Sequence, residues 1–191
     1  LMESSAMTSL LVGAEMFYEK KEHTISSMLI SPMTETEYLL GKIIANILNI
    51  LLIFVIIGVS LYFFKDFLFN FHWLFLGIIL VSSYYVFIGV LLSYISKDFT
   101  ALLMNYMILM IVLVLPSIFV MIGILPQSTL DFIFWSPTEV TLRLLNASFS
   151  SSFDGIQYLM DTVYIVSLSF VLYKFLVLPN FKSYATKDLG V

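Results

Sequence analysis

Long apolar runs separated by short polar stretches dominate the sequence. Three of these runs contain no Asp, Glu, Lys or Arg, and a fourth carries Asp161 and Lys174 near its ends; the runs cover residues 43–64, 73–96, 101–125 and 158–178. A helix needs about 20 apolar residues to cross about 30 Å of hydrocarbon. The pattern therefore predicts four membrane-spanning helices, with Asp161 and Lys174 reaching the interface by snorkelling.

The first 17 residues are apolar and rich in small side chains, but Glu3 and Glu15 interrupt them. This stretch is too short for a full crossing, and it has neither the basic start nor the cleavage site of a signal peptide. We interpret residues 1–17 as the end of a truncated span. On this interpretation residues 1–191 form one transmembrane domain that lacks its amino-terminal part.

Positive charges set the expected orientation, because Lys and Arg collect in short cytoplasmic loops. With residues 18–42 in the cytoplasm, only Lys65 and Arg143 fall outside, and the other basic residues fall inside: Lys20, Lys21, Lys42, Lys97, Lys174, Lys182 and Lys187. The resulting map has a cytoplasmic segment at 18–42, an external turn at 65–72, a cytoplasmic turn near Lys97, an external segment at 126–157 and a cytoplasmic tail at 179–191.

The cytoplasmic segment 18–42 has the pattern of two short helical pieces. Ile25, Met28 and Leu29 recur at the spacing of one apolar helix face. Pro32 ends that helix, and the sequence TETE at 34–37 has the spacing of a capping box that opens a second helix running into the next span. The first piece fits either an amphipathic helix on lipid headgroups or a docking surface for a soluble partner.

The external segment 126–157 also carries helix signals. The sequence SPTE at 136–139 offers a capping Ser, a Pro at the first helical position and an acidic residue in the first turn, and Ser128 with Asp131 repeats the signal earlier. Two short apolar helices between spans predict a re-entrant hairpin that dips into the outer leaflet. The alternative is an aromatic loop at the interface.

Composition agrees with a membrane protein and excludes other classes. The chain is 60% hydrophobic and 12% charged, and its mean hydropathy is +1.01. A net charge of -4 offers no basic surplus for binding nucleic acid. There are no cysteines, and His23 and His72 lie far apart, so we expect no metal site.

The cytoplasmic segment resembles that of permease subunits of ABC type-2 exporters. That family shows the pattern E-(R/K)-x-x-G-T, then an apolar helix, S-P and L-(L)-G-K at the start of a span. The matching positions here are Glu19, Lys20, Thr24, Ser31, Pro32, Leu39, Leu40, Gly41 and Lys42. His23 departs from the pattern, because the family usually has Gly there, and this leaves the helix boundary open.

The layout of nearly the whole chain is similar to that family as well. The resemblance implies the end of span two, a cytoplasmic coupling helix, spans three to six, and a re-entrant helical pair before span six. The stretch PTEVTLRLL at 137–145 looks most like that of drug or antibiotic exporters, which implies multidrug efflux.

The resemblance also implies partners. Two permease copies, as a homodimer or a heterodimer, would sit in the plasma (inner) membrane of a prokaryote above two ABC ATP-binding subunits. Those subunits would hold ATP and Mg, and the coupling helix would seat in a cleft on them. The candidate coupling residues are Glu19, Glu22, Thr24, Ile25, Met28 and Leu29.

We expect this chain to have no catalytic residues and no cofactor of its own. A P-loop needs G-x-x-x-x-G-K-(S/T), but around Gly41 and Lys42 the first Gly position is Thr36 and the last position is Ile43. ATP hydrolysis is therefore expected in a partner, and this chain is not expected to be an enzyme.

Polar residues within the spans are candidates for the translocation pathway, because they are costly in hydrocarbon. Asn46 and Asn49 are three residues apart, and Asn105 lies at a similar depth in another span; they pair across helices or contact substrate. Glu3 lies about 24 Å from the cytoplasmic interface, counted back from Glu19. It either attracts a cationic substrate or reaches external water.

Small residues and a proline add expectations about packing. Gly89 and Ser93 have the spacing of a close helix contact, and Pro116 predicts a kink in its span.

The alternative function is a secondary transporter or channel driven by an ion gradient. Such proteins usually show carboxylates at the midplane or paired interrupted helices, and the three charge-free spans show neither. A membrane enzyme would need clustered His, Asp or Glu at membrane depth. The sequence therefore predicts an all-α polytopic membrane protein that acts as an exporter permease, with its substrate left open.

Overall fold

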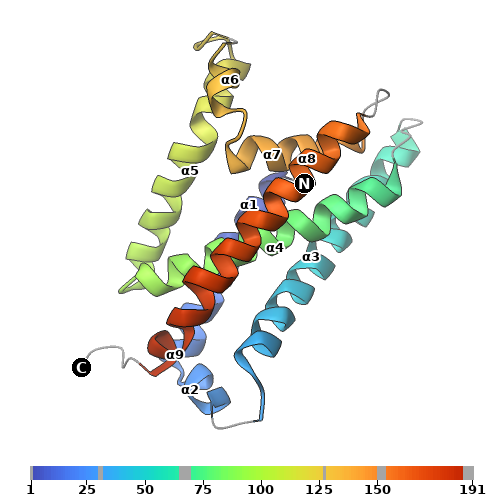
Figure 1. Cartoon of the computed structure of the whole chain (residues 1–191). Helices are drawn as coiled ribbons and strands as arrows, with labels where there is room; N and C mark the ends of the chain where they lie inside the picture. The colour runs from blue at the N-terminus through green and yellow to red at the C-terminus, as the bar shows by residue number, and fades with distance from the viewer. Residues whose placement is uncertain (1, 30–31, 65–69, 127, 150–153, 187–191) are drawn as a thin grey trace.

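The computed structural model describes residues 2–29, 32–64, 70–126, 128–149 and 154–186. Within these ranges every regular element is helical (Figure 1). The elements are α1 (Met2–Lys21), α2 (Thr24–Leu29), α3 (Glu35–Phe64), α4 (Phe71–Ile95), α5 (Phe99–Met121), α6 (Thr129–Ile133), α7 (Pro137–Ala147), α8 (Gly155–Val171), the π-helix η1 (Leu172–Val177) and α9 (Leu178–Thr186).

The all-α fold class is confirmed. Four helical stretches in the described residues are long and apolar enough to cross a membrane: Glu35–Ser60, His72–Ile95, Phe99–Val120 and Gly155–Thr186. Each overlaps one predicted span. The interpretation of residues 1–17 as the end of a span stays a prediction, because α1 is less apolar and continues to Lys21.

The predicted start of α3 is confirmed, while the end of the last helix differs from the expected boundary. α3 begins at Glu35 because the predicted capping box forms: Thr34 N donates to Glu37 Oε2 at 2.7 Å, and Glu37 N donates to Thr34 Oγ1 at 3.3 Å. The last helix does not end at 178. It continues through η1 into α9 as far as Thr186, so residues 179–186 are helical and not an irregular tail.

α4 lies at the centre of the molecule, with α1 packed along it (Figure 1). A Cβ atom on Gly89 would lie 2.5 Å from the carbonyl oxygen of Ser9, and one on Gly13 would lie 3.1 Å from the carbonyl oxygen of Gly89. The absence of side chains at these two positions lets the backbones touch. The predicted close contact at Gly89 and Ser93 is confirmed, since Ser93 is also buried.

Two buried apolar clusters hold the helices together. The outer cluster joins α3, α4, α7 and α8 and includes Ile50, Ile78, Leu144 and Ile165. The inner cluster joins α1, α2, α4 and α9 and includes Val12, Met16, Ile25, Val90 and Phe181. α3, α5 and α8 keep most of their apolar surface exposed, as expected for helices in contact with lipid.

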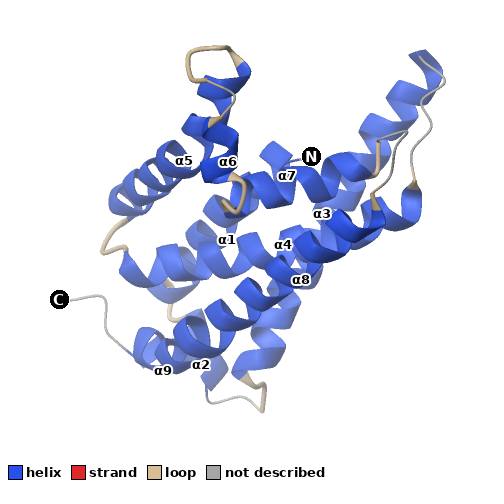
Figure 2. Cartoon of the chain, turned by 45° about the horizontal axis from the view of Figure 1, so that its top comes forward, coloured by secondary structure: helices blue, strands red, loops and turns tan. Residues whose placement is uncertain are grey.

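The segments that the predicted orientation places on opposite sides of the membrane lie at opposite ends of the molecule. α2, α9 and the α4–α5 turn lie at one end, and α6 and α7 lie toward the other (Figures 1 and 2). We call the first the cytoplasmic end and the second the external end. Most of the expected external turn 65–72, and Lys187, lie outside the described residues.

Candidate functional site

The predicted coupling segment begins with a tight turn at His23. This residue has φ 59°, in the left-handed region that favours glycine. Its N–H donates to Lys20 O at 3.0 Å, and its carbonyl accepts from Ser27 N at 3.0 Å. The pattern that this segment resembles usually has glycine at this position. Here a histidine adopts the left-handed turn. α1 ends and α2 begins on either side of it.

One residue of the predicted apolar face of α2, Ile25, faces the protein, which corrects one assignment. Ile25 is 1% exposed and belongs to the inner cluster with Phe181 and Ala185 of α9. Ile25 was expected to contact a partner ATPase, but here it anchors α2 to the last helix. Glu22 and Thr24 are exposed, and the side chains of Met28 and Leu29 lie outside the described ones.

Glu19, another candidate coupling residue, is part of an ionic cluster between α1 and α3. Lys42 Nζ lies 2.7 Å from Glu19 Oε1 and 2.8 Å from Glu15 Oε2. The hydroxyl of Tyr38 donates to Glu19 Oε2. The Lys42 side chain is only 12% exposed, so the cluster is partly desolvated and its charge-assisted bonds are strong. Glu19 therefore braces α1 against α3.

α9 ties the same helices together at the cytoplasmic end. The hydroxyl of Tyr184 donates to Met16 O at 3.1 Å, and Lys182 Nζ lies 3.7 Å from Glu35 Oε1. The hydroxyls of Thr36 and Tyr173 are 3.1 Å apart. These contacts join the last helix to α1 and α3.

The asparagines of the predicted pathway do not pair with one another. Asn46 is buried and donates to Lys42 O in its own helix at 2.9 Å, while Asn49, three residues on, is exposed. Asn105 donates to Ser96 Oγ at 3.2 Å, across the α4–α5 turn. The predicted pairing between Asn46 and Asn105 is therefore wrong, because nearer acceptors satisfy both amides. The Glu3 side chain lies outside the described ones.

A buried ion pair at the external end was missed by the sequence analysis. Arg143 of α7 makes two parallel bonds to Asp161 of α8: Nη2 to Oδ1 at 2.7 Å and Nε to Oδ2 at 3.0 Å. Gln157 Nε2 also donates to Asp161 Oδ1 at 3.0 Å, and Arg143 Nη1 donates to Phe134 O at 2.8 Å. Asp161 is 1% exposed. The expectation that it snorkels to water is wrong.

Further contacts hold the external segment between two spans. Thr138 Oγ1 donates to Leu113 O of α5 at 2.8 Å. On the other side, the hydroxyl of Tyr164 in α8 donates to Trp135 O at 2.7 Å. α7 therefore links α5 to α8 at the external end.

The two predicted external helices form as α6 and α7, with one local difference. Ser136 stands at the cap position of α7, but its hydroxyl pairs with that of Thr138 at 3.0 Å and caps no backbone N–H. Whether this pair of helices dips into the bilayer stays a prediction. Within the described ranges, no group of three His, Cys, Asp or Glu side chains is placed to hold a metal ion.

One sequence signal could have revealed the external ion pair. Arg143 is the single arginine of the chain, and Asp161 is an acidic residue inside an apolar run. A charge within a membrane span is usually paired. The pairing itself depends on how α7 crosses α8, which no local pattern encodes.

Comparisons with known proteins add one match. The family model described as ABC-2 family transporter protein matches residues 1–178. No curated protein and no solved structure matches the chain.

Proposed function

This chain belongs to the ABC-2 family of transporter proteins, and we propose that it is the permease of an ATP-driven exporter that couples to separate ATP-binding subunits. Its partners in this proposal are two such subunits, which hold ATP and Mg, and a second permease copy. The assembly sits in the plasma membrane of a prokaryotic cell.

One observation supports the coupling role more than any other. Glu22, in the turn before α2, and Thr24, the first residue of α2, are exposed, while Ile25 is buried against α9. A helix that only rested on lipid headgroups would turn its apolar side outward to the bilayer. The arrangement instead offers a polar surface to a soluble partner and an apolar anchor to the spans.

The contact between Ile25 and α9 can transmit movement from α2 to the spans. When the ATP-binding subunits close, they push α2, and Ile25 passes the displacement to α9 through the inner cluster. The Glu19–Lys42 ion pair passes it from the end of α1 to the start of α3. Because interiors are close-packed, such contacts move as units.

The sequence of α7 suggests a class of transported compound. The stretch at 137–145 that looks like drug exporters forms α7, which links α5 and α8 at the external end. We propose export of drug-like compounds, with Asn49 on α3 and Glu3 on α1 as candidate pathway contacts.

The experiment pairs the permease with its ATP-binding subunit in liposomes and measures ATP turnover and transport together. The variant Glu22→Arg with Thr24→Arg should abolish the stimulation of ATP turnover by permease. Thr100→Arg, an exposed residue at the same end in the first turn of α5, serves as the matched control.

Two outcomes would contradict the proposal. Equal effects of the α2 variant and the Thr100 control would remove α2 from coupling. Transport that persists without any ATP-binding subunit and stops when the ion gradient is dissipated would identify a secondary transporter.

A further inference from the structure

The last span changes from α-helix to π-helix at η1. There Leu178 N donates to Tyr173 O, five residues earlier, where an α-helix would bond four residues back. Pro179 follows directly and has no N–H to donate. Helices bend most sharply at prolines and at π-turns. Both of these features therefore stand between α8 and α9.

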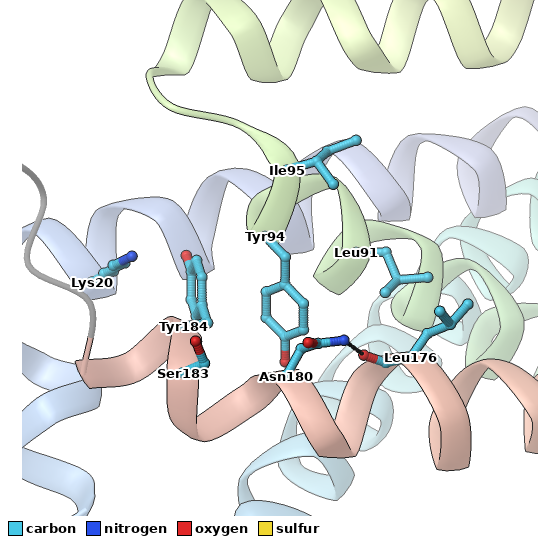
Figure 3. A pocket seen from close by; sticks show the side chains of 8 residues that line it. All are labelled: Lys20, Leu91, Tyr94, Ile95, Leu176, Asn180, Ser183 and Tyr184. Atoms are coloured by element: carbon cyan, nitrogen blue, oxygen red, sulfur yellow. Dashed lines mark hydrogen bonds between the residues drawn. The ribbon is translucent and has the colours of Figure 1, made fainter.

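Side chains bond to the carbonyls of this wide turn. Asn180 Nδ2 donates to Leu176 O at 2.8 Å, and the hydroxyl of Tyr94 in α4 donates to Val177 O at 3.3 Å. Figure 3 shows the Asn180 bond along the last helix and Tyr94 reaching toward it from α4. A side chain can rotate to follow its acceptor, so these carbonyls keep a donor when the helix bends.

The helix before η1 and the helix after it belong to different buried clusters. On α8, Ile165 lies in the outer cluster, and Asp161 is bonded to Arg143 of α7. On α9, Phe181 lies in the inner cluster. Leu172, the first residue of η1, packs against both clusters. The π-helix therefore stands at the boundary between a part held at the external end and a part held at the cytoplasmic end.

A pocket lies beside this boundary, between α1, the end of α4 and the η1–α9 helix (Figure 3). Its volume is about 350 Å³, and its walls include Leu91, Tyr94, Ile95, Leu176, Asn180 and Ser183. Close packing normally leaves a helix no room to swing. This pocket leaves room between α9 and the end of α4.

We propose that η1 and Pro179 form a hinge on which α9 swings toward the end of α4 when the coupling helix moves. The inference rests on the proposed coupling role of α2. Ile25 of α2 packs with Phe181 of α9 in the inner cluster, so a push on α2 displaces α9 first. Asp161 keeps α8 fastened to Arg143 meanwhile. The hinge thus separates movement at the cytoplasmic end from the external end.

The test uses the permease with its ATP-binding subunit in liposomes, without nucleotide and with a non-hydrolysable ATP analogue. Because the chain has no cysteine, spin labels attach only at introduced cysteines, and electron paramagnetic resonance measures the distance between two labels. Thr100→Cys in α5 is paired with Thr186→Cys in α9 or with Phe170→Cys in α8; all three residues are exposed. A bend of about 20° over the 9 residues of α9 moves its end by about 4 Å. We expect that shift for Thr186 and none for Phe170.

Two variants probe the pocket and the proline separately. Ile95→Trp fills the pocket and should abolish the shift; because Ile95 is 65% exposed, this variant is expected to fold. Ile108→Trp, an exposed isoleucine of α5 that does not line the pocket, is the matched control and should keep the shift. Pro179→Ala restores an N–H donor and should reduce both the shift and the stimulation of ATP turnover.

The results that would overturn the hinge differ from those that would overturn the proposed function. Equal shifts for Thr186 and Phe170 would show that the last span moves as one rod. A fixed Thr186 distance in a complex whose ATP turnover is still stimulated by the permease would overturn the hinge and leave the proposed function unaffected. A shift that persists in Ile95→Trp would overturn the swing into the pocket. A permease that does not stimulate ATP turnover would overturn the proposed function, and the hinge with it.

Discussion

Arg143 and Asp161 meet through two parallel hydrogen bonds, of 2.7 and 3.0 Å, that fasten the external helix α7 to the last span. Removal of one partner would leave a buried charge without compensation, which costs about 3–5 kcal/mol. Asp161→Ala should therefore lower the thermal unfolding temperature strongly and free α7 from α8. Thermal unfolding in detergent, with limited proteolysis of the external segment, measures both effects.

A double variant distinguishes the ion pair from simple packing. Arg143→Met with Asp161→Leu replaces both charges by apolar groups and should regain most of the lost stability, since apolar replacements of buried pairs are often neutral or better. Glu139→Gln, elsewhere on α7, is the control and should shift stability by less than about 0.5 kcal/mol. A double variant as unstable as Asp161→Ala would refute this account.

The contact at Gly89 predicts a strong effect from one added methyl group. A Cβ there would lie 2.5 Å from a backbone oxygen of α1, which cannot rotate away as a side chain does. Gly89→Ala should therefore separate α1 from α4 and cost about 1–3 kcal/mol. Gly41→Ala is the matched control. It has no atom within 4 Å and should be neutral or stabilising by up to about 1 kcal/mol. Similar unfolding temperatures for both variants would contradict the close approach.

The left-handed backbone of His23 predicts that glycine is better there. His23→Gly removes the steric cost of a Cβ at φ 59° and should stabilise the protein by up to about 1 kcal/mol. His23→Val should destabilise it, because a branched side chain suits this region poorly. Lys21→Gly, in the last turn of α1, is the control and should be destabilising. A lower unfolding temperature for His23→Gly than for the wild type would show that the turn depends on the imidazole.

The cluster around Lys42 links stability to coupling. Lys42→Met leaves the Glu15 and Glu19 carboxylates facing each other without their cation, so the α1–α3 contact should weaken. We expect a lower unfolding temperature and reduced stimulation of ATP turnover by the permease. Adding Glu19→Gln to Lys42→Met should recover part of the stability, because it removes the repulsion. A Lys42→Met variant with wild-type stability and coupling would show that the cluster is only a surface contact.

Short stretches of sequence were sufficient to predict the helices whose bounds depend only on neighbouring residues. The charge-free runs predicted the spans, since hydrocarbon tolerates little but apolar helices. The 34–37 capping box and the Pro137 start predicted where α3 and α7 begin. The continuation of the last helix beyond Pro179 was not predicted, because a proline normally ends a helix and the π-turn that accommodates it depends on neighbours such as Tyr94.

By itself the sequence determined the class, the number of apolar spans and the family resemblance, because hydropathy acts on each segment separately; the orientation stays a prediction. Tertiary structure decided which charges meet. Lys42 with Glu19, and Arg143 with Asp161, lie 23 and 18 residues apart and are joined only by the way their helices cross. It also turned Ile25 inward, since the apolar surface of α9 covers that side of α2. A side chain's role is set by what packs against it, and that is a property of the assembled helices.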